Sequence, residues 1–340
     1  NNDPVPPTAL TVAWTSTGAA ITTVKLEYTS NGTDWVTIKS DVDNTGAKTY
    51  DWAVSSPGAL PMNVASNNMK IRISASNPPQ PVELYPEVMS AVFTLCGDLT
   101  VTSPTDATTW IADGLANDTI SWDVYGKVDN VKIDYTRGGT GSWSTIVTTT
   151  NAEAGDAAVN KGAYSWTLPT DPADPAGPAN GDYITRFNTN GKSSVVRIFD
   201  ADANFDDLVQ DDSQGFIAKG RLVITQPASV AGGLDCGDLQ TIEWQRDGRI
   251  FAVNVKYSIN SGSTYPNTIQ GDRVFENDSA LTQVTTSQWP VPETPMVTTY
   301  RLLVEDTEYE KDGAAGTFVE TVDFRVNGEL ELTAPLSPTI

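Results

Sequence analysis

The sequence contains no histidine, and this absence limits the chemistry that the chain can perform. Histidine is the usual general base, a common metal ligand and the partner of a nucleophilic serine or cysteine. Only two cysteines occur, Cys96 and Cys236, so the chain has neither a disulfide framework nor a thiolate zinc site. We therefore expect a protein that is not an enzyme.

Basic residues are also scarce. The 340 residues include 21 Lys and Arg against 43 Asp and Glu, which gives a net charge of −22. Nucleic acids and anionic membrane surfaces both require a basic footprint, so neither is expected as a partner. No apolar run approaches the ~20 residues of a membrane-spanning helix, and no membrane insertion is expected. The negative net charge instead favours solubility and the attraction of counter-cations.

One phrase occurs three times in the chain. It reads FTLCGDLTVTSP from Phe93 to Pro104, FIAKGRLVITQP from Phe216 to Pro227, and FRVNGELELTAP from Phe324 to Pro335. Other markers recur between the copies in a fixed order. They are tryptophans that end an apolar-alternating run (Trp14, Trp122, Trp244), tyrosines that follow them (Tyr28, Tyr135, Tyr257) and a second set of tryptophans (Trp52, Trp166, Trp289). So many ordered markers indicate internal repeats.

Each repeat contains about seven short segments with period-2 alternation, separated by Gly, Asn, Asp and Pro turns. This pattern is typical of an antiparallel β-sandwich. We expect the two repeated tryptophans of each unit to lie on facing sheets and to fill one core. Trp35 and Trp143 follow a turn and are expected to cap that core. Trp110 has no counterpart in the other repeats, which makes it the best candidate for an exposed or interface aromatic side chain.

The pattern resembles the tandem immunoglobulin-like repeats of large bacterial cell-surface proteins of the S-layer, sheath or filament type. It covers nearly the whole chain, and the second repeat matches it best. Repeat one lacks the opening strand, and repeat three reads NSGSTYP where the pattern has a Gly-Gly-Ser-Trp turn. The resemblance implies an all-β fold and a role as a spacer, lattice builder or adhesive stalk.

Glycines in the repeated phrase give the domain boundaries. We expect immunoglobulin-like repeats at 1–97, 98–220 and 221–328, and a further first strand or donor strand at 329–340. The predicted junctions hold one or two residues and no Gly/Ser linker. Short junctions restrict interdomain motion, so the sequence predicts an extended and fairly stiff rod.

The densest acidic segment is DADANFDDLVQDD, from Asp200 to Asp212. Its oxygen-bearing side chains alternate, and a looping backbone directs every second side chain inward, as Ca²⁺ requires. An EF-hand is excluded because Phe205 stands where that loop needs glycine. A calcium loop of another kind and a merely solvated acidic loop both remain open. The calcium hypothesis assigns as ligands Asp200, Asp202, Asn204, Asp206 and Asp211.

Sandwich topology places this acidic loop at the junction with repeat one, beside Asp123 and Asp129. A cation there would cancel the repulsion between carboxylates and stiffen the junction. The corresponding loop of repeat three carries Glu305, Asp306, Glu308 and Asp312. Paired carboxylates also occur in glycosidases, but proximity is common among 43 acidic residues, and catalysis is not expected.

We expect a non-enzymatic structural building block of an extracellular surface array, coat or filament, located at the cell surface. One alternative is an adhesin that binds a surface glycan or a protein through an exposed aromatic side chain such as Trp110. Another is the passive stalk of a secreted hydrolase. The main expected partner is the chain itself, as neighbouring copies or adjacent repeats.

The chain holds three repeats that are out of phase. Repeat one reaches Trp14 without the first strand, and that strand's sequence follows Gly328. One explanation is that the chain is a window on a longer array. The other is strand exchange between molecules, in which Leu330, Leu332 and Pro335 of one molecule enter the gap in the next.

Overall fold

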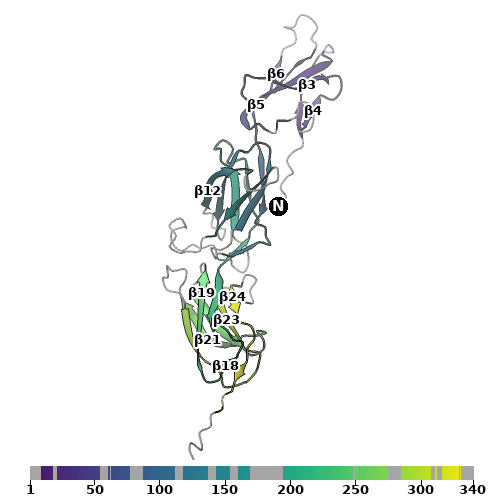
Figure 1. Cartoon of the computed structure of the whole chain (residues 1–340). Helices are drawn as coiled ribbons and strands as arrows, with labels where there is room; N and C mark the ends of the chain where they lie inside the picture. Colours follow the sequence, from purple (N-terminus) through teal and green to yellow (C-terminus); the bar gives the residue numbers. More distant parts are fainter. Residues whose placement is uncertain are drawn as a thin grey trace, which may run out of the picture.

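The computed structural model of the chain describes residues 9–17, 21–53, 60–61, 63–76, 87–111, 118–136, 143–153, 160–168, 194–247, 250, 252–274, 285–307, 311, 316–328 and 330. Every regular element among them is a β-strand, and none of these residues forms a helix that could span a membrane. The strands form three units that follow one another along an extended rod (Figure 1). The predicted all-β fold and extended shape are confirmed.

The strands of each unit are consecutive in the sequence. Unit one comprises β1 (Ala9–Ala13), β2 (Thr23–Thr29), β3 (Val36–Asp43), β4 (Thr49–Ala53), β5 (Ser66–Ala75), β6 (Val88–Met89) and β7 (Phe93–Leu95). Unit two comprises β8 (Asp98–Ser103), β9 (Thr109–Ile111), β10 (Asp118–Tyr125), β11 (Asn130–Thr136), β12 (Trp143–Asn151), β13 (Lys161–Trp166), β14 (Val195–Asp200), β15 (Gln210–Asp212) and β16 (Ile217–Lys219). Unit three comprises β17 (Arg221–Gln226), β18 (Leu234–Asp235), β19 (Leu239–Asp247), β20 (Ala252–Ser258), β21 (Asn267–Val274), β22 (Thr285–Pro290), β23 (Arg301–Asp306), β24 (Phe318–Glu320) and β25 (Val326–Asn327).

Units two and three are immunoglobulin-like sandwiches with the same strand order. A three-stranded sheet, β13-β10-β8 or β17-β19-β22, packs on a four-stranded sheet, β12-β11-β14-β15 or β21-β20-β23-β24. The short strand after the first one pairs in parallel with the last strand, as β9 with β16 and β18 with β25. All other pairings in these sheets are antiparallel, which is the arrangement of an immunoglobulin-type domain.

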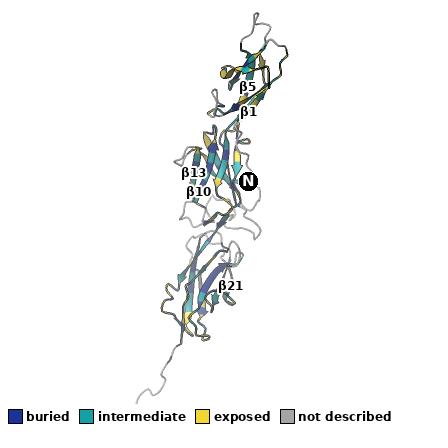
Figure 2. Ribbon diagram, turned by 90° about the vertical axis from the view of Figure 1, so that its right-hand side faces the viewer, coloured by how far each residue is buried: buried dark blue, intermediate teal, exposed yellow. Residues whose placement is uncertain are grey.

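Unit one has the same plan with fewer strands among its described residues. Its larger sheet, β3-β2-β5-β6, carries β7 as a further partner of β5, whereas the facing sheet holds only β1 and β4. Five of its described residues form a buried apolar cluster, against eighteen in unit two and fourteen in unit three. Buried residues therefore lie along the centre of each unit (Figure 2), and the described buried cluster is smallest in unit one.

The repeated tryptophans fill the cores, but their predicted placement on facing sheets is wrong. Trp122 lies on β10 and Trp166 on β13, and these strands are neighbours in one sheet. The facing sheet supplies the tyrosine that meets the second tryptophan. The ring centroids are 5.0 Å apart for Tyr28–Trp52, 5.0 Å for Tyr135–Trp166 and 5.2 Å for Tyr257–Trp289. Alternation predicts which face of a strand is buried, but not the sheet that the strand joins.

Trp110 is a core residue, so its predicted exposure is wrong. It is 9% exposed, and its ring lies edge-on to Phe216 and Trp166, with centroid distances of 4.8 and 6.0 Å. Its strand β9 places it opposite Ala218, whereas unit three pairs Leu234 with Val326 at the corresponding position. Unit two therefore has a large side chain opposite a small one, whereas unit three has two side chains of intermediate size. The two arrangements fill a similar volume in the core. The missing counterpart of Trp110 therefore reflects packing.

Trp35 and Trp143 do not cap the core. Each ring lies beneath an arginine, with the guanidinium carbon of Arg72 4.3 Å from the Trp35 ring and that of Arg197 4.1 Å from the Trp143 ring. Arg197 alternates on β14 with the buried residues Val196 and Ile198, so this contact lies on the outer face of the sheet. The tryptophans thus pair with cations at the surface.

The units are joined without linkers. Two residues separate β7 from β8, and one residue, Gly220, separates β16 from β17. At the first junction, Gly97 lies so close to the loop after β10 that an added Cβ would be 2.8 Å from the carbonyl oxygens of Tyr125 and Lys127. Only glycine permits this approach of two backbones.

Candidate functional site

The acidic loop of unit two, residues 201–209 between β14 and β15, lies at the junction with unit one. Its backbone forms tight turns, in which the amides of Phe205 and Asp206 donate to the carbonyl of Asp202 at 2.9 and 3.1 Å. The amides of Leu208 and Val209 donate to the carbonyl of Phe205. Phe205 and Val209 are buried in the core of unit two and anchor the loop.

The carboxylates of this loop accept hydrogen bonds from its own backbone. The Asp200 side chain is buried, and its Oδ1 accepts from the amide of Asp202 at 2.9 Å. Asp202 Oδ1 accepts from the backbone amide and the side-chain amide of Asn204 at 2.9 and 2.8 Å. Asp206 Oδ1 accepts from the amide of Asp207 at 3.0 Å. Asp and Asn stabilise turns in this way without a ligand.

Asp211 is directed elsewhere. It lies on β15, and its Oδ2 accepts a hydrogen bond of 2.7 Å from the backbone amide of Val101 on β8, in the other sheet. Its neighbour Asp212 points to the outer face, where Arg197 donates to it at 2.6 and 2.9 Å. The structure therefore gathers Asp200, Asp202, Asn204 and Asp206 in one loop and uses Asp211 to join the two sheets.

Asp200 is buried and lies close to several other carboxylates. Burial raises the pKa of this carboxyl above its usual value of 3.8, and the charges of Asp202, Asp129 and Asp206 raise it further. The hydrogen bond from the Asp202 amide acts in the opposite direction. The pKa of the nearby Cys96 thiol is also raised, first by burial and then by Asp98 and Asp200. Cys96 is a free thiol without the lowered pKa of a nucleophile.

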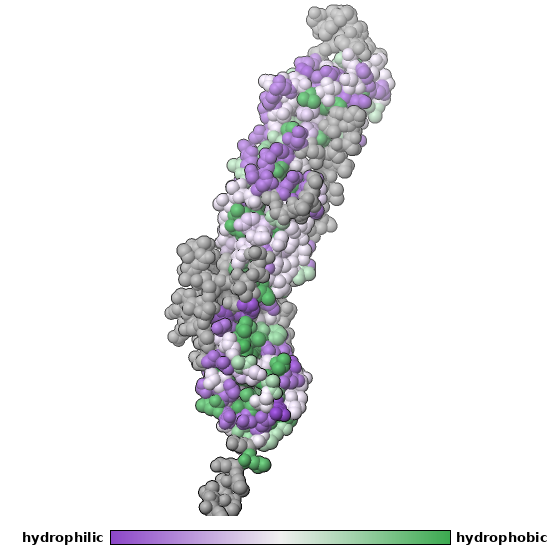
Figure 3. Space-filling view, viewed as in Figure 1, coloured by the Kyte–Doolittle hydropathy of each residue, from purple (hydrophilic) through white to green (hydrophobic). Residues whose placement is uncertain are grey.

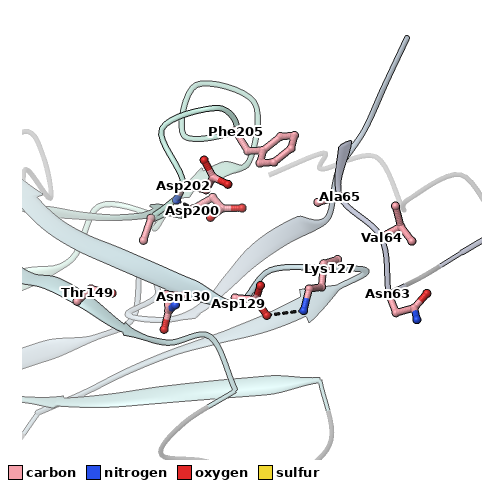
Figure 4. Close-up of a pocket in the computed structure, with 11 residues that line it drawn as sticks. Asn63, Val64, Ala65, Lys127, Asp129, Asn130, Thr149, Asp200, Asp202 and Phe205 are labelled. Atoms are coloured by element: carbon pink, nitrogen blue, oxygen red, sulfur yellow. Dashed lines mark hydrogen bonds and ion pairs between the residues drawn. The ribbon is translucent and has the colours of Figure 1, made fainter. Parts of the chain in front are cut away.

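A hollow of about 600 Å³ separates the acidic loop from unit one, and we call it the junction hollow. Its walls come from both units (Figure 4). The lining residues are Asn63, Val64 and Ala65 of unit one and Lys127, Asp129, Asn130, Thr149, Asp200, Ala201, Asp202 and Phe205 of unit two. Lys127 pairs with Asp129, and Ala65 packs against the core of unit two.

No group of three or more acidic, cysteine or histidine side chains among the described residues is arranged to hold a metal ion. At the end of β23, directly before the corresponding loop of unit three, the buried Glu305 pairs with Lys256 at 2.6 Å. Asp306 is buried beside it, and Glu308 and Asp312 lie outside the described residues. Among the described residues of the two loops, the geometry therefore does not require a bound cation.

The second junction contains a contact that the sequence did not reveal. Lys219, the residue before the junction glycine, donates from Nζ to the carbonyl of Gly316 in unit three at 3.0 Å. Cys96 occupies the same position in the repeated phrase and lies beside Asp200 of the next unit. In both cases the residue before the glycine lies close to the segment that links β14 to β15, or β23 to β24, in the following unit. Aligning the three copies of the repeated phrase would identify the residue before the glycine, but it would not predict which residue that side chain contacts.

Of the predicted assembly strand, only Leu330 is described. It is fully exposed, at 101%, and Leu332 and Pro335 lie outside the described residues.

No protein-family model matches the sequence, and no curated protein matches it. Among solved structures, the chain is similar to three N-terminal domains of the bacteriophage RB49 Highly Immunogenic Outer Capsid protein (Hoc), with 9% identity and a TM-score of 0.25, covering 94% of this chain and 92% of that one. It is also similar to an ICAM-5 D1–D4 ectodomain fragment, with 12% identity and a TM-score of 0.29, covering 76% of this chain and 60% of that one. A chimeric titin Z1Z2 tandem has 8% identity and a TM-score of 0.22, and 68% of this chain covers 100% of it. These identities and TM-scores are low, so the immunoglobulin-like fold is assigned from the sheet order described above.

Proposed function

We propose that the chain is a non-enzymatic structural building block of an extracellular surface array, coat or filament. The observation that carries this proposal is the end-to-end joining of three sandwiches by one or two residues. With no linker to extend, the separation of the two ends is fixed by the stacked sandwiches, which suits a spacer or lattice element.

Contacts across both junctions support a stiff rod. Ala65 packs on the core of unit two, and Gly97 lies against the loop after β10. At the second junction, burial lowers the pKa of Lys219, and its ammonium group is held by the Gly316 carbonyl. Bending at either junction would expose apolar surface or break a hydrogen bond, so straight arrangements are favoured.

The adhesin alternative loses its main support. Its proposed contact residue, Trp110, is enclosed by Phe216 and Trp166 and cannot stack on a glycan without unfolding of β9. The visible face of the rod mixes hydrophilic and apolar groups along its length (Figure 3). The alternative role as the passive stalk of a secreted hydrolase would need the same stiffness. It differs from the proposed role only in that the rod would carry a hydrolase.

Calcium remains part of the proposal as a ligand of the acidic loop. The pKa of Asp200 is raised first by burial and then by the charges of Asp202, Asp129 and Asp206, and a bound cation would offset both effects. Binding would require Asp202 and Asp206 to turn from their backbone partners toward Asp200. Asp211 takes no part, because it holds the Val101 amide.

Small-angle X-ray scattering and negative-stain electron microscopy of the purified chain test the structural role. We expect a narrow distribution of lengths and a scattering profile of a straight rod. The matched control inserts Gly-Ser-Gly-Ser between Gly220 and Arg221 and should broaden the length distribution. A wild-type chain as flexible as this control would contradict the proposal. Protease accessibility on intact source cells would test the cell-surface location.

A further inference from the structure

The first strand of unit three lies at the edge of its sheet. Among the described residues β17 pairs only with β19, and the corresponding strand β8 of unit two pairs only with β10. The two strands share one register, because Val101 is opposite Trp122 and Ile224 is opposite Trp244. An edge strand can accept a further strand from another molecule unless side chains protect it.

In unit two, carboxylates protect this edge. The amide of Leu99 donates to Oδ1 of Asp98 at 2.9 Å, and the amide of Val101 donates to Oδ2 of Asp211 at 2.7 Å. Both amides therefore point away from β10, toward the edge of the sheet. Each of them already has an acceptor, so the edge of β8 offers little to a further strand.

Unit three has different residues at both of these acceptor positions. Arg221 corresponds to Asp98, because each directly follows the glycine of the repeated phrase. Val319 corresponds to Asp211, because each is the middle residue of the short edge strand that pairs with the long strand before it. An arginine side chain carries only donors and a valine side chain carries no polar atom, so neither can accept a hydrogen bond from a backbone amide.

The two amides that these positions would serve belong to Leu222 and Ile224. The shared register directs them away from β19, as the amides of Leu99 and Val101 point away from β10. In an antiparallel strand the carbonyl group of a residue points to the same side as its amide. β17 therefore directs two N–H groups and two C=O groups toward its open edge.

A groove of about 360 Å³ lies along this edge, between β17, the turn that follows it and β24. Ile224, Val319 and Val322 are among its lining residues, and Val322 is 72% exposed. Val322 stands where unit two has Gln214, whose Oε1 accepts from the amide of Asp106 at 3.1 Å. In unit three an exposed apolar side chain thus replaces a polar bond across the groove.

The groove is a neutral region of a strongly negative chain. The net charge of −22 makes copies of the chain repel one another. Among the described residues that line the groove, only Glu320 is charged, and Lys311 pairs with it at 2.8 Å. A second copy can therefore approach through this face without bringing unpaired carboxylates together.

We propose that β17 of one copy pairs with β17 of a second copy of this chain, antiparallel and in a register centred on Val223. This names a contact for the proposed structural role and rests on that role. The register places Leu222 of each copy opposite Ile224 of the other, so the outward amides of each strand donate to the outward carbonyl groups of the other. Val223, which is 37% exposed, meets its own counterpart at the two-fold axis. Arg221 lies opposite the uncharged Thr225 of the other copy.

A second copy fits this edge because the contact is self-complementary. Each copy supplies the same two donors and the same two acceptors, as an isologous two-fold contact requires. The three-stranded sheets of the two copies would join into one continuous sheet. Since β17 begins directly after the junction glycine Gly220, antiparallel pairing directs unit two of the two copies to opposite ends. The contact thus ties two rods side by side, which a coat or array can use.

Analytical ultracentrifugation of the unmodified chain tests the contact. We expect a concentration-dependent equilibrium between monomer and dimer. The dimer should become more stable as sodium chloride is raised from about 0.01 to about 0.15 M, because salt screens the repulsion between the two negative chains. A chain that stays monomeric under all these conditions would overturn the proposal. Scattering of the monomer would still report a straight or a flexible rod, so the structural role is judged separately.

A carboxylate at the edge provides the sharpest variant. Val319→Asp introduces in unit three the acceptor that Asp211 provides in unit two, so the Ile224 amide would already be bonded. Dimerisation should weaken on the order of tenfold or more, because the two-fold axis doubles the loss of one hydrogen bond. Leu239→Asp is the matched control, because it adds the same charge at an exposed position at the far end of β19. It should leave dimerisation nearly unchanged, and equal weakening by both variants would overturn the β17 contact.

A cysteine at the two-fold axis tests the register. Facing residues of a non-hydrogen-bonded antiparallel pair have Cα atoms about 4.5 Å apart, which is within the range for a disulfide. Val223→Cys, in a chain that also carries Cys96→Ser and Cys236→Ser, should therefore form a disulfide-linked dimer under the oxidant diamide. Leu239→Cys in the same background should not. Circular dichroism checks that each variant is folded, and a folded Val223→Cys chain that does not cross-link would overturn the proposed pairing.

Discussion

Asp200 is the side chain that carries the largest electrostatic conflict at the first junction. It is 5% exposed, near the charges of Asp202, Asp129 and Asp206, and these conditions raise its pKa. A carboxyl whose pKa is higher in the folded protein than in the unfolded chain favours folding only while it is protonated. At neutral pH its ionised form therefore lowers the stability of unit two.

Replacing Asp200 with asparagine should raise the melting temperature at pH 7 in the absence of divalent cations. The asparagine keeps a carbonyl oxygen for the Asp202 amide and removes the charge. As the pH falls through the raised pKa of Asp200, the melting temperature of the wild type should approach that of the variant. The two melting temperatures should match below about pH 4, near the usual pKa of 3.8. Thermal unfolding across this pH range measures the effect.

Asp207→Asn is the control for this prediction, because it removes one charge from an exposed position of the same loop. It should change the melting temperature much less. Equal effects of both variants at pH 7 would show that net charge, and not the burial of Asp200, governs stability.

Calcium should stabilise the wild type if the acidic loop binds it. At a hundredfold excess over the dissociation constant the gain would be about 2.7 kcal/mol. Asp200→Asn and Asp202→Ala should lose this gain, whereas Asp211→Ala should keep it because that carboxylate faces Val101. Melting curves with calcium and with chelator provide the measurement, and identical curves for the wild type would end the calcium hypothesis.

At the scale of elements, β15 places two neighbouring aspartates on opposite faces of one sheet. Asp211 accepts from the Val101 amide on edge strand β8 and thereby joins the two sheets of unit two. Asp212 forms a surface pair with Arg197, whose side chain also lies over Trp143. The same residue type thus has two roles, which depend only on the direction of its side chain.

Removing the inward carboxylate should cost more than removing the outward one. Asp211→Ala leaves a partly buried amide without its acceptor, which typically costs about 1–3 kcal/mol of unfolding free energy. Asp212→Ala breaks a solvent-exposed ion pair, and such pairs contribute at most about 1 kcal/mol. Urea unfolding monitored by tryptophan fluorescence compares the two. A larger loss for Asp212→Ala would contradict the role of Asp211 between the sheets.

For the whole molecule, the junctions decide whether three sandwiches act as one rod. Gly97 is the tightest point of the first junction. An added Cβ there would lie 2.6 Å from Val128 Cγ2 and 2.8 Å from two backbone carbonyl oxygens. Backbone atoms cannot move aside as the end of a flexible side chain can, so the junction backbone at Gly97 would have to shift away from the turn after β10.

Gly97→Ala should therefore loosen the first junction. We expect a broader distribution of lengths in scattering and electron microscopy, and a loss of about 1–3 kcal/mol in the stability of unit two, as for other overpacked sites. Gly232→Ala is the control, because nothing lies within 4 Å of its added Cβ. An unchanged rod for Gly97→Ala would show that the junction tolerates displacement.

The sequence by itself determined the all-β fold, the tandem sandwiches and the rod. These depend on local properties: period-2 alternation, turn residues and the repeated phrase, each of which is readable along the chain. It also placed the acidic loop at the first junction, since the order of strands fixes the pole to which each loop returns.

Only the tertiary structure decided which side chains meet. Trp122 and Trp166 share a sheet, Trp110 is packed in a core, and Asp211 turns to Val101, because contacts between distant strands depend on sheet order and on small differences in packing. Alternation assigns a side chain to a face, but the partner on that face comes from elsewhere in the chain.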